Sequence, residues 1–185
     1  MVFKEQQVSN TVWAFATVKN NSPIVFDAVC KYIQEKNMVG FNSQDVSNTL
    51  WAFATVNNIS PIVFDAVCKY IQEKGMNGFN PQNVKDTVWA FATVKNNSPI
   101  VFDAVCKYIQ ENGMVDFNTQ EMSNTVWAFA TVNNNSSILF EEVIKYIEKG
   151  IDDLNQQDVS NTVWAFATVN NYNPIVFEKV CKYIQ

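Results

Sequence analysis

Polar and apolar positions along this chain follow a pattern that repeats every 37–38 residues. Within residues 42–56, apolar or small side chains recur at helical spacing, namely Val46, Thr49, Leu50, Phe53 and Ala54. Asn42 is a favourable N-cap, and Asp45 lies three residues later, where it can complete a capping box. The pattern predicts a first helix that ends near Val56.

A second helix is predicted after a short loop. It begins at Ser60-Pro61, a cap residue followed by proline at the first helical position, and Gly75 is suited to end it. Its apolar stripe consists of Phe64, Val67, Cys68 and Ile71. Two helices of about 14 residues joined by a short loop form an antiparallel hairpin.

The same hairpin occurs five times. Its tryptophan recurs at Trp13, Trp51, Trp89, Trp127 and Trp164, and the repeats span residues 3–40, 41–78, 79–116, 117–153 and 154–185. The fourth repeat is one residue short, and the deletion falls within residues 150–153. One hairpin cannot bury its apolar stripe, whereas stacked hairpins can, so the sequence predicts a single all-α domain, an α-solenoid. Both chain ends fall inside a repeat, which is typical of a piece of a longer array.

The composition argues against catalysis. The net charge is −5, and the chain has no histidine. It also lacks a glycine-rich phosphate loop and any pairing of a nucleophile with a base. We therefore expect no enzyme activity, no cofactor and no small-molecule substrate. The longest strictly apolar run has five residues, too few to span a bilayer, so no membrane partner is expected.

Four cysteines occur once per repeat, at Cys30, Cys68, Cys106 and Cys181. No Cys-x-x-Cys pair is present, and the fourth repeat has Ile144 at the same position. A position that accepts isoleucine is a small apolar core position, which favours packing over a metal site or a disulfide.

Lysines of the second helix form a regular series, and each has an acidic residue four positions earlier. The pairs are Asp27 with Lys31, Asp65 with Lys69, Asp103 with Lys107, Glu141 with Lys145, and Glu178 with Lys182. This spacing favours ion pairs within the helix, so the series predicts a solvated and largely neutral outer face.

The tryptophans allow two interpretations. Trp51 lies away from the stripe of Val46, Leu50 and Phe53, nearer to Gln44. That position is compatible with stacking on nucleic-acid bases and also with packing against the next repeat. Helical repeats more often use such aromatic residues for packing, which is the interpretation we favour.

The motif Asn-Thr-Leu/Val-Trp-Ala-Phe-Ala, preceded by Gln-x-Val-Ser-Asn-Thr at residues 44–49, resembles the octotricopeptide repeat family. It is also similar to the heptatricopeptide-like repeats found beside RAP and FAST-kinase-like domains. The resemblance covers residues 3–185. It implies a sequence-selective binder of single-stranded RNA that acts in chloroplasts or mitochondria on RNA processing, stability or translation.

The resemblance directs attention to the polar face of the first helix, because comparable helical repeats bind one base with two or three side chains. The candidate RNA-binding residues are Gln7, Asn10, Asp45, Ser47, Asn48, Asn83, Lys85, Asp86, Glu121, Asn124, Asp158 and Asn161. The alternative is that these are solvated helix residues of a scaffold that binds protein partners.

Overall fold

The computed structural model describes residues 3–150 and 153–184, and these residues form ten α-helices. Each repeat contributes two of them, which confirms the predicted all-α solenoid. The helices are α1 (Glu5–Thr17), α2 (Pro23–Lys36), α3 (Ser43–Thr55), α4 (Pro61–Lys74), α5 (Pro81–Thr93), α6 (Pro99–Asn112), α7 (Thr119–Thr131), α8 (Ser137–Lys149), α9 (Gln156–Thr168) and α10 (Pro174–Ile184). The deletion in the fourth repeat lies partly outside the described residues.

Local caps set the start of the odd-numbered helices. The side chain of Asn42 accepts a hydrogen bond from the backbone N–H of Asp45 at 2.8 Å, and the Asp45 carboxylate accepts one from the backbone N–H of Asn42 at 3.2 Å. The predicted capping box is therefore confirmed, and it recurs at the start of α5, α7 and α9.

The even-numbered helices start differently from the prediction. Proline does occupy the first turn of α4, but Ser60 makes no side-chain capping bond. Its hydroxyl lies 3.2 Å from the thiol of Cys30 in the preceding repeat. The fixed φ of proline and its missing N–H leave less for a cap to satisfy, so the serine is free for a contact between repeats.

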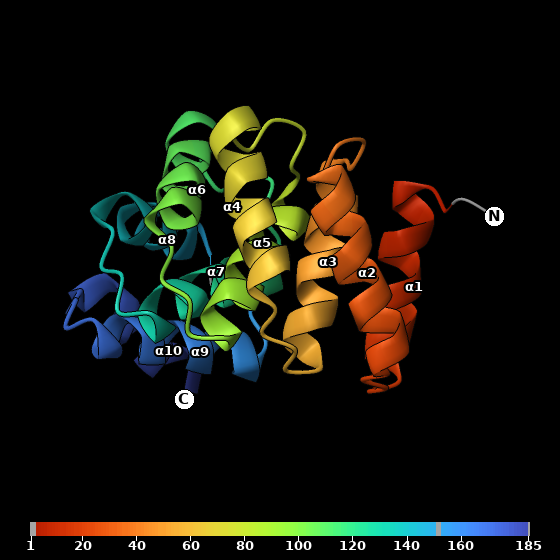
Figure 1. Cartoon of the computed structure of the whole chain (residues 1–185). Coiled ribbons are helices and arrows are strands. Elements are labelled where there is room, and N and C mark those ends of the chain that lie inside the picture. The colour runs from red at the N-terminus through yellow and green to blue at the C-terminus, as the bar shows by residue number, and fades with distance from the viewer. Residues whose placement is uncertain (1–2, 151–152, 185) are drawn as a thin grey trace.

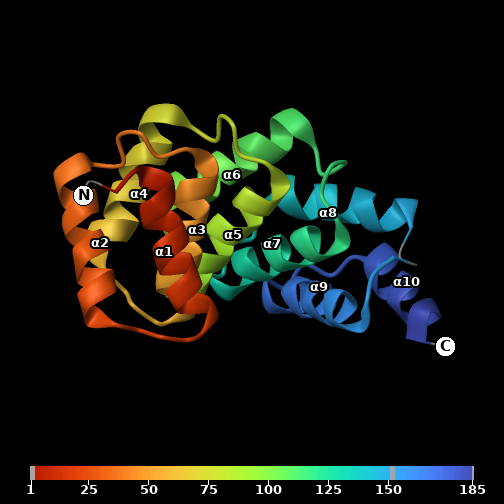
Figure 2. The same ribbon diagram turned by 90° about the vertical axis from the view of Figure 1, so that its right-hand side faces the viewer.

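The odd-numbered helices form one layer and the even-numbered helices form another, and the first layer is packed more closely. Neighbouring odd-numbered helices contact each other far more extensively than neighbouring even-numbered helices do. The array therefore curves with the odd-numbered helices on the inside, and the even-numbered helices arc around them (Figures 1 and 2).

Alanine is the reason that the inner helices come so close. Ala52 and Ala54 of α3 are both buried, and they face different neighbouring helices. The equivalent of Ala52 in the first repeat, Ala14, is exposed, whereas the equivalent of Ala54 in the last repeat, Ala167, is exposed. The first alanine thus faces the preceding helix and the second faces the following one. Without larger side chains between them, the two backbones approach closely.

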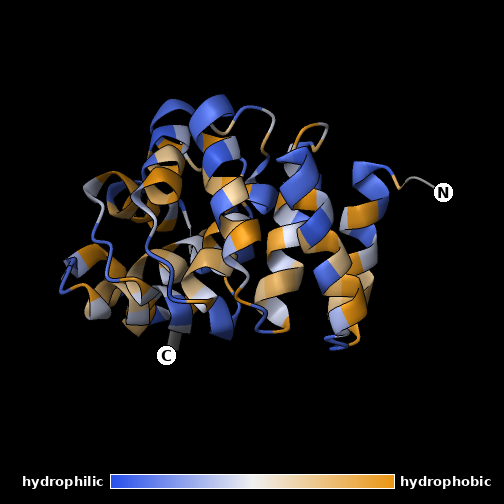
Figure 3. Cartoon of the chain, viewed as in Figure 1, coloured by the Kyte–Doolittle hydropathy of each residue, from blue (hydrophilic) through white to orange (hydrophobic). Residues whose placement is uncertain are grey.

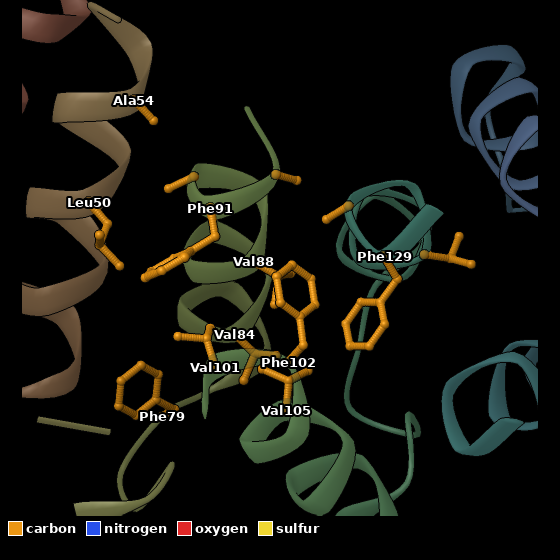
Figure 4. Close-up of a cluster of buried hydrophobic side chains, with 14 of the residues drawn as sticks. Leu50, Ala54, Phe79, Val84, Val88, Phe91, Val101, Phe102, Val105 and Phe129 are labelled. Atoms are coloured by element: carbon orange, nitrogen blue, oxygen red, sulfur yellow. The ribbon is translucent and has the colours of Figure 1, made fainter. Parts of the chain in front are cut away.

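Hydrophobic and hydrophilic residues alternate along the helices (Figure 3), and the buried hydrophobic side chains form one core cluster. Each junction between repeats contains an edge-to-face pair of phenylalanines, such as Phe64 of α4 with Phe91 of α5, whose ring centroids lie 5.1 Å apart. Phe102 of α6 and Phe129 of α7 repeat the arrangement at 4.9 Å (Figure 4). Because these rings join adjacent repeats, the core is continuous along the array.

We expect Ala90→Leu to destabilise the protein by about 1–3 kcal/mol, because the added methylenes have no space between two inner helices. Urea unfolding followed by circular dichroism would measure the change. Ala14→Leu is the matched control, since the same position in the first repeat is exposed. Equal losses in the two variants would contradict the packing described.

Candidate functional site

The inner layer carries a row of tryptophan side chains, one from each odd-numbered helix. The rings of Trp13 and Trp51 lie 6.0 Å apart between centroids and are tilted by 34°, and those of Trp127 and Trp164 lie 6.4 Å apart at 31°. Trp13 and Trp164, at the two ends, are each 44% exposed, and the three between them are half-buried. The rings of the first pair and of the last pair therefore pack on each other, and all five rings remain partly open to solvent.

A row of amide side chains runs beside the tryptophans, three residues before each of them. It contains Asn10, Asn48, Asn124 and Asn161, with Asp86 in the third repeat. Asn161 Nδ2 donates to Asn124 Oδ1 at 3.3 Å, so the side chains of this row lie within hydrogen-bond distance of each other in the last two repeats. An exposed glutamine lies four residues before each member of this row, at Gln6, Gln44, Gln82, Gln120 and Gln157. We call the glutamine, asparagine and tryptophan rows together the inner stripe.

A second polar row is buried between neighbouring inner helices. Ser9 Oγ donates to Asp45 Oδ1 at 2.8 Å, Asn83 Nδ2 donates to Ser47 Oγ at 3.0 Å, and Ser123 Oγ donates to Asp158 Oδ1 at 2.7 Å. Each bond joins one repeat to the next. The acceptors and donors are almost inaccessible to solvent, and hydrogen bonds of this kind satisfy polar groups that are costly to bury alone.

The junction between the third and fourth repeats lacks this bond. Lys85 replaces the serine, and its ammonium group pairs with the neighbouring carboxylate of Asp86. Among the described residues, no hydrogen bond joins Lys85 to Glu121 of the next repeat. Burial raises the pKa of Asp86 above its ordinary value, and the adjacent lysine offsets part of that increase. The hydroxyl of Thr87, which is fully buried, also has no hydrogen-bond partner among the described residues.

The twelve candidate residues consequently fall into two sets. Seven lie at least partly exposed along the inner helices: Gln7, Asn10, Asn48, Lys85, Glu121, Asn124 and Asn161. Five are buried: Asp45, Ser47, Asn83, Asp86 and Asp158. Four of these buried residues make the bonds between repeats, and Asp86 pairs with Lys85, so the buried set does not form the surface that a ligand meets in this conformation. The exposed glutamine row was not among the candidates, although its invariant recurrence four residues before each asparagine position is visible in the sequence.

A threonine lies four residues, about one helical turn, after each tryptophan. Thr17 Oγ1 donates to the carbonyl of Trp13 at 2.8 Å. The hydroxyls of the equivalent Thr55, Thr93 and Thr131 have no hydrogen-bond partner among the described residues. Three successive repeats therefore leave a polar group unsatisfied beside their tryptophan, which is uncommon in folded proteins.

The lysines of the even-numbered helices lie on the outer layer, away from the inner stripe. Lys107 pairs with Glu111 at 3.9 Å and Lys145 with Glu142 at 2.6 Å. The predicted partners four residues earlier, Asp103 and Glu141, form no ion pair within the described residues, so the expected pairing is wrong in detail. Exposed pairs of this kind contribute little to stability.

The cysteines line the contact between successive even-numbered helices. Cys30, Cys68 and Cys106 lie 3.0–3.3 Å from the hydroxyls of Ser60, Ser98 and Ser136 in the following repeat. Cys106 is buried and belongs to the core, as predicted, whereas Cys30 and Cys68 are half-buried and pack against the core from its edge. Cys181, which has no following repeat, is exposed.

Two further features of the described residues concern ligands and membranes. Within residues 3–150 and 153–184, no group of three or more Cys, Asp and Glu side chains is arranged to hold a metal ion. None of the helices described has the length and apolar character needed to cross a membrane.

Neither a protein-family model nor a curated protein matches this sequence.

We expect the double substitution Lys85→Ser with Asp86→Asn to stabilise the protein by about 1 kcal/mol at neutral pH. It removes a buried carboxylate and restores the serine that joins repeats elsewhere. Chemical unfolding of both proteins would measure the difference.

The advantage of this variant should depend on pH. The folded-state pKa of Asp86 is raised, so the cost of its charge is present at neutral pH and disappears as the pH falls toward the ordinary value of 3.8. The two proteins should therefore converge in stability in acid. A difference that grows as the pH falls would contradict the assignment.

The thiols should react with iodoacetamide in an order set by burial. Burial raises the pKa of the Cys30, Cys68 and Cys106 thiols, which lowers their thiolate fraction near neutral pH. We expect Cys181 to be alkylated first and Cys106 last, as followed by mass spectrometry of the native protein. Equal rates for all four, in a protein shown to be folded, would be inconsistent with the contacts described.

Proposed function

We propose that this protein binds single-stranded RNA along the inner stripe, with one repeat contacting one nucleotide. The observation that supports this most directly is the regular recurrence of an amide side chain beside a partly exposed tryptophan on the inside of the curve. Amides donate and accept hydrogen bonds at base edges, and aromatic rings stack on bases of any identity.

The geometry of the repeat supports a periodic ligand. Packed helices lie about 8–10 Å apart, so the inner helices present equivalent groups at a constant interval on that scale. Helical-repeat proteins that bind RNA use one repeat per base with two or three side chains each. In this chain the proposed set is a glutamine, an asparagine and a tryptophan, as in Gln44, Asn48 and Trp51 of α3, and it recurs in every odd-numbered helix except α5, where Asp86 replaces the asparagine.

The resemblance to octotricopeptide repeats supports the same proposal and extends it. On that basis we propose a role in RNA processing, stability or translation in a chloroplast or mitochondrion. The protein would act by covering or presenting a short RNA segment, without chemistry of its own.

The third repeat should contribute a different base preference from the others. Its position in the amide row presents no amide, because Asp86 is buried and pairs with Lys85, whereas the partly exposed Lys85 can only donate hydrogen bonds. Selection from randomised RNA should enrich a short motif for the natural protein. The Lys85→Ser, Asp86→Asn variant should enrich a motif that differs at one central position. Identical motifs from both would contradict base readout by this row.

Single substitutions should separate the inner stripe from the outer layer. Asn48→Ala should weaken binding of the selected RNA by roughly 1–3 kcal/mol, the scale of one good base contact. Gln72→Ala removes an exposed amide from the outer helix α4 and is the matched control, with no change expected. Fluorescence anisotropy would measure both affinities.

Binding should also depend only weakly on salt. The inner stripe contains few lysines, because most of them lie on the outer layer, so few phosphates are neutralised. For single strands the slope of log K against log salt is about −0.7 for each phosphate contact, and we expect a total near −1 to −2. A slope several times steeper would indicate binding through the lysines of the even-numbered helices.

A protein-interaction scaffold is the second candidate. The net charge of −5 favours it, because an acidic surface repels phosphates, and curved solenoids suit extended protein partners. Failure of the randomised selection to enrich any RNA motif would favour this function over RNA binding.

A further inference from the structure

Two Asn-Gly dipeptides lie where an even-numbered helix passes into the loop before the next repeat. Asn77-Gly78 follows α4, and Asn112-Gly113 stands at the end of α6. Asparagine is a thermolabile residue, and glycine after it favours deamidation, because no side chain hinders attack of the glycine nitrogen on the asparagine amide. Both asparagine side chains are exposed. The two sites therefore differ in the surroundings of their backbone and not in their access to water.

The backbone at Asn112 is held by the end of α6. Asn112 is the last residue of that helix, and its Nδ2 donates to the carbonyl of Tyr108 at 2.8 Å. The backbone N–H of Gly113 donates to the carbonyl of Ile109 at 2.7 Å. The nitrogen that would attack Asn112 is thus bound in the last helical turn, and the reaction requires that turn to open.

The backbone at Asn77 lies beyond the end of its helix. α4 ends at Lys74, and the N–H of Gly78 makes no hydrogen bond among the described residues. The dipeptide is held by a turn bond from the N–H of Phe79 to the carbonyl of Met76, at 3.1 Å, and by Asn77 Nδ2, which donates to the carbonyl of Lys74 at 2.9 Å. An exposed turn opens at a smaller cost in free energy than a helical turn packed on the core.

We propose that Asn77 is a site of spontaneous deamidation in the folded protein and that the fold protects Asn112. The backbone nitrogen of Gly78 gives up its proton and bonds to Cγ of Asn77, which closes a succinimide ring. The Cγ–Nδ2 bond breaks, and Nδ2 takes up a proton and leaves as ammonia. Solvent water then opens the ring at either carbonyl carbon, which leaves aspartate or isoaspartate at position 77. Nothing is oxidised or reduced, and water is the only co-reactant.

The isoaspartate product alters the connection between α4 and α5, because it adds a methylene carbon to the main chain. The carbonyl of Gly78 accepts a hydrogen bond from Ser43 Oγ, in the first turn of α3, at 2.6 Å. This bond fastens the loop before the third repeat to the inner helix of the second. The longer backbone displaces the carbonyl and weakens the bond. The inference is independent of RNA binding, because it rests on this loop and not on the inner stripe.

Peptide mapping by mass spectrometry, during incubation of the native protein at neutral pH, should show Asn77 converted several times faster than Asn112. Both aspartate and isoaspartate should form at position 77. In the urea-unfolded protein the two sites should react at similar rates, because the chain then holds neither dipeptide. Equal rates in the native protein, faster conversion of Asn112, or no conversion of Asn77 would overturn the proposal.

Matched variants can be taken from the other repeats. Asn77→Val introduces the residue that stands at the equivalent exposed positions, Val39 and Val115, and Asn112→Lys introduces the equivalent of Lys74. Both variants should fold. Asn77→Val should abolish the fast reaction, whereas Asn112→Lys should leave its rate unchanged. A fast reaction that persists in folded Asn77→Val would overturn the assignment to this site.

The effect on the fold can be measured separately. The isoaspartate form, purified by ion exchange, should unfold at a lower urea concentration than Asn77→Asp, which carries the same charge on an unaltered backbone. Equal midpoints for the two proteins would overturn the claim that the added methylene disturbs the contact between Ser43 and Gly78.

Discussion

Close approach of the inner helices is the constraint on which the rest of this structure depends. It requires a small residue on each side of the contact, and alanine occupies both positions throughout the middle of the array. The short distance brings Ser9 within 2.8 Å of Asp45 and places the ring of Trp13 against that of Trp51. It also makes the inner layer shorter than the outer one, which produces the curvature. One property of the side chain, its size, therefore governs the polar bonds, the aromatic row and the shape.

The Asp45 side chain has two roles, one in its own helix and one in the contact with the preceding repeat. One carboxylate oxygen accepts the cap bond from Asn42, and the other accepts from Ser9 of the preceding repeat. Folding of the helix and stacking of the repeats are thereby coupled through one group. Where the third repeat departs from this arrangement, with Lys85 and Asp86, the charge is neutralised locally and the junction loses its hydrogen bond. The cap of α7 is nevertheless retained, because Glu121 still accepts from Asn118.

The helices and their ends were predictable because their causes are local. Asn42, Asp45 and Pro61 act within one turn, and the periodicity of Trp51 and its equivalents gives the register of the repeats. The role of Asp45 between repeats was not predictable in the same way, because its partner lies 36 residues earlier and the distance depends on how closely two helices pack. The packing role of the cysteines was predictable, since Cys106 is in the core and Cys68 packs against it, but for the same reason the contact of Cys68 with Ser98 in the next repeat was not. The candidate set mixed exposed and buried residues because neighbours on a polar helix face differ in burial once another helix covers part of it.

The unequal contacts of the two layers have a mechanical consequence. An array deforms where its contacts are weakest, and here those are the contacts between even-numbered helices, which include a thiol–hydroxyl contact such as that of Cys106 with Ser136. The alanine contacts of the inner layer resist any change in spacing, because tightly packed interiors are hardly compressible. The protein should therefore bend by changing the distances between even-numbered helices. The distances between odd-numbered helices should stay constant while the curvature of the array varies. A molecule bound along the inner helices would therefore meet equivalent side chains at a constant interval, even when the even-numbered helices move apart.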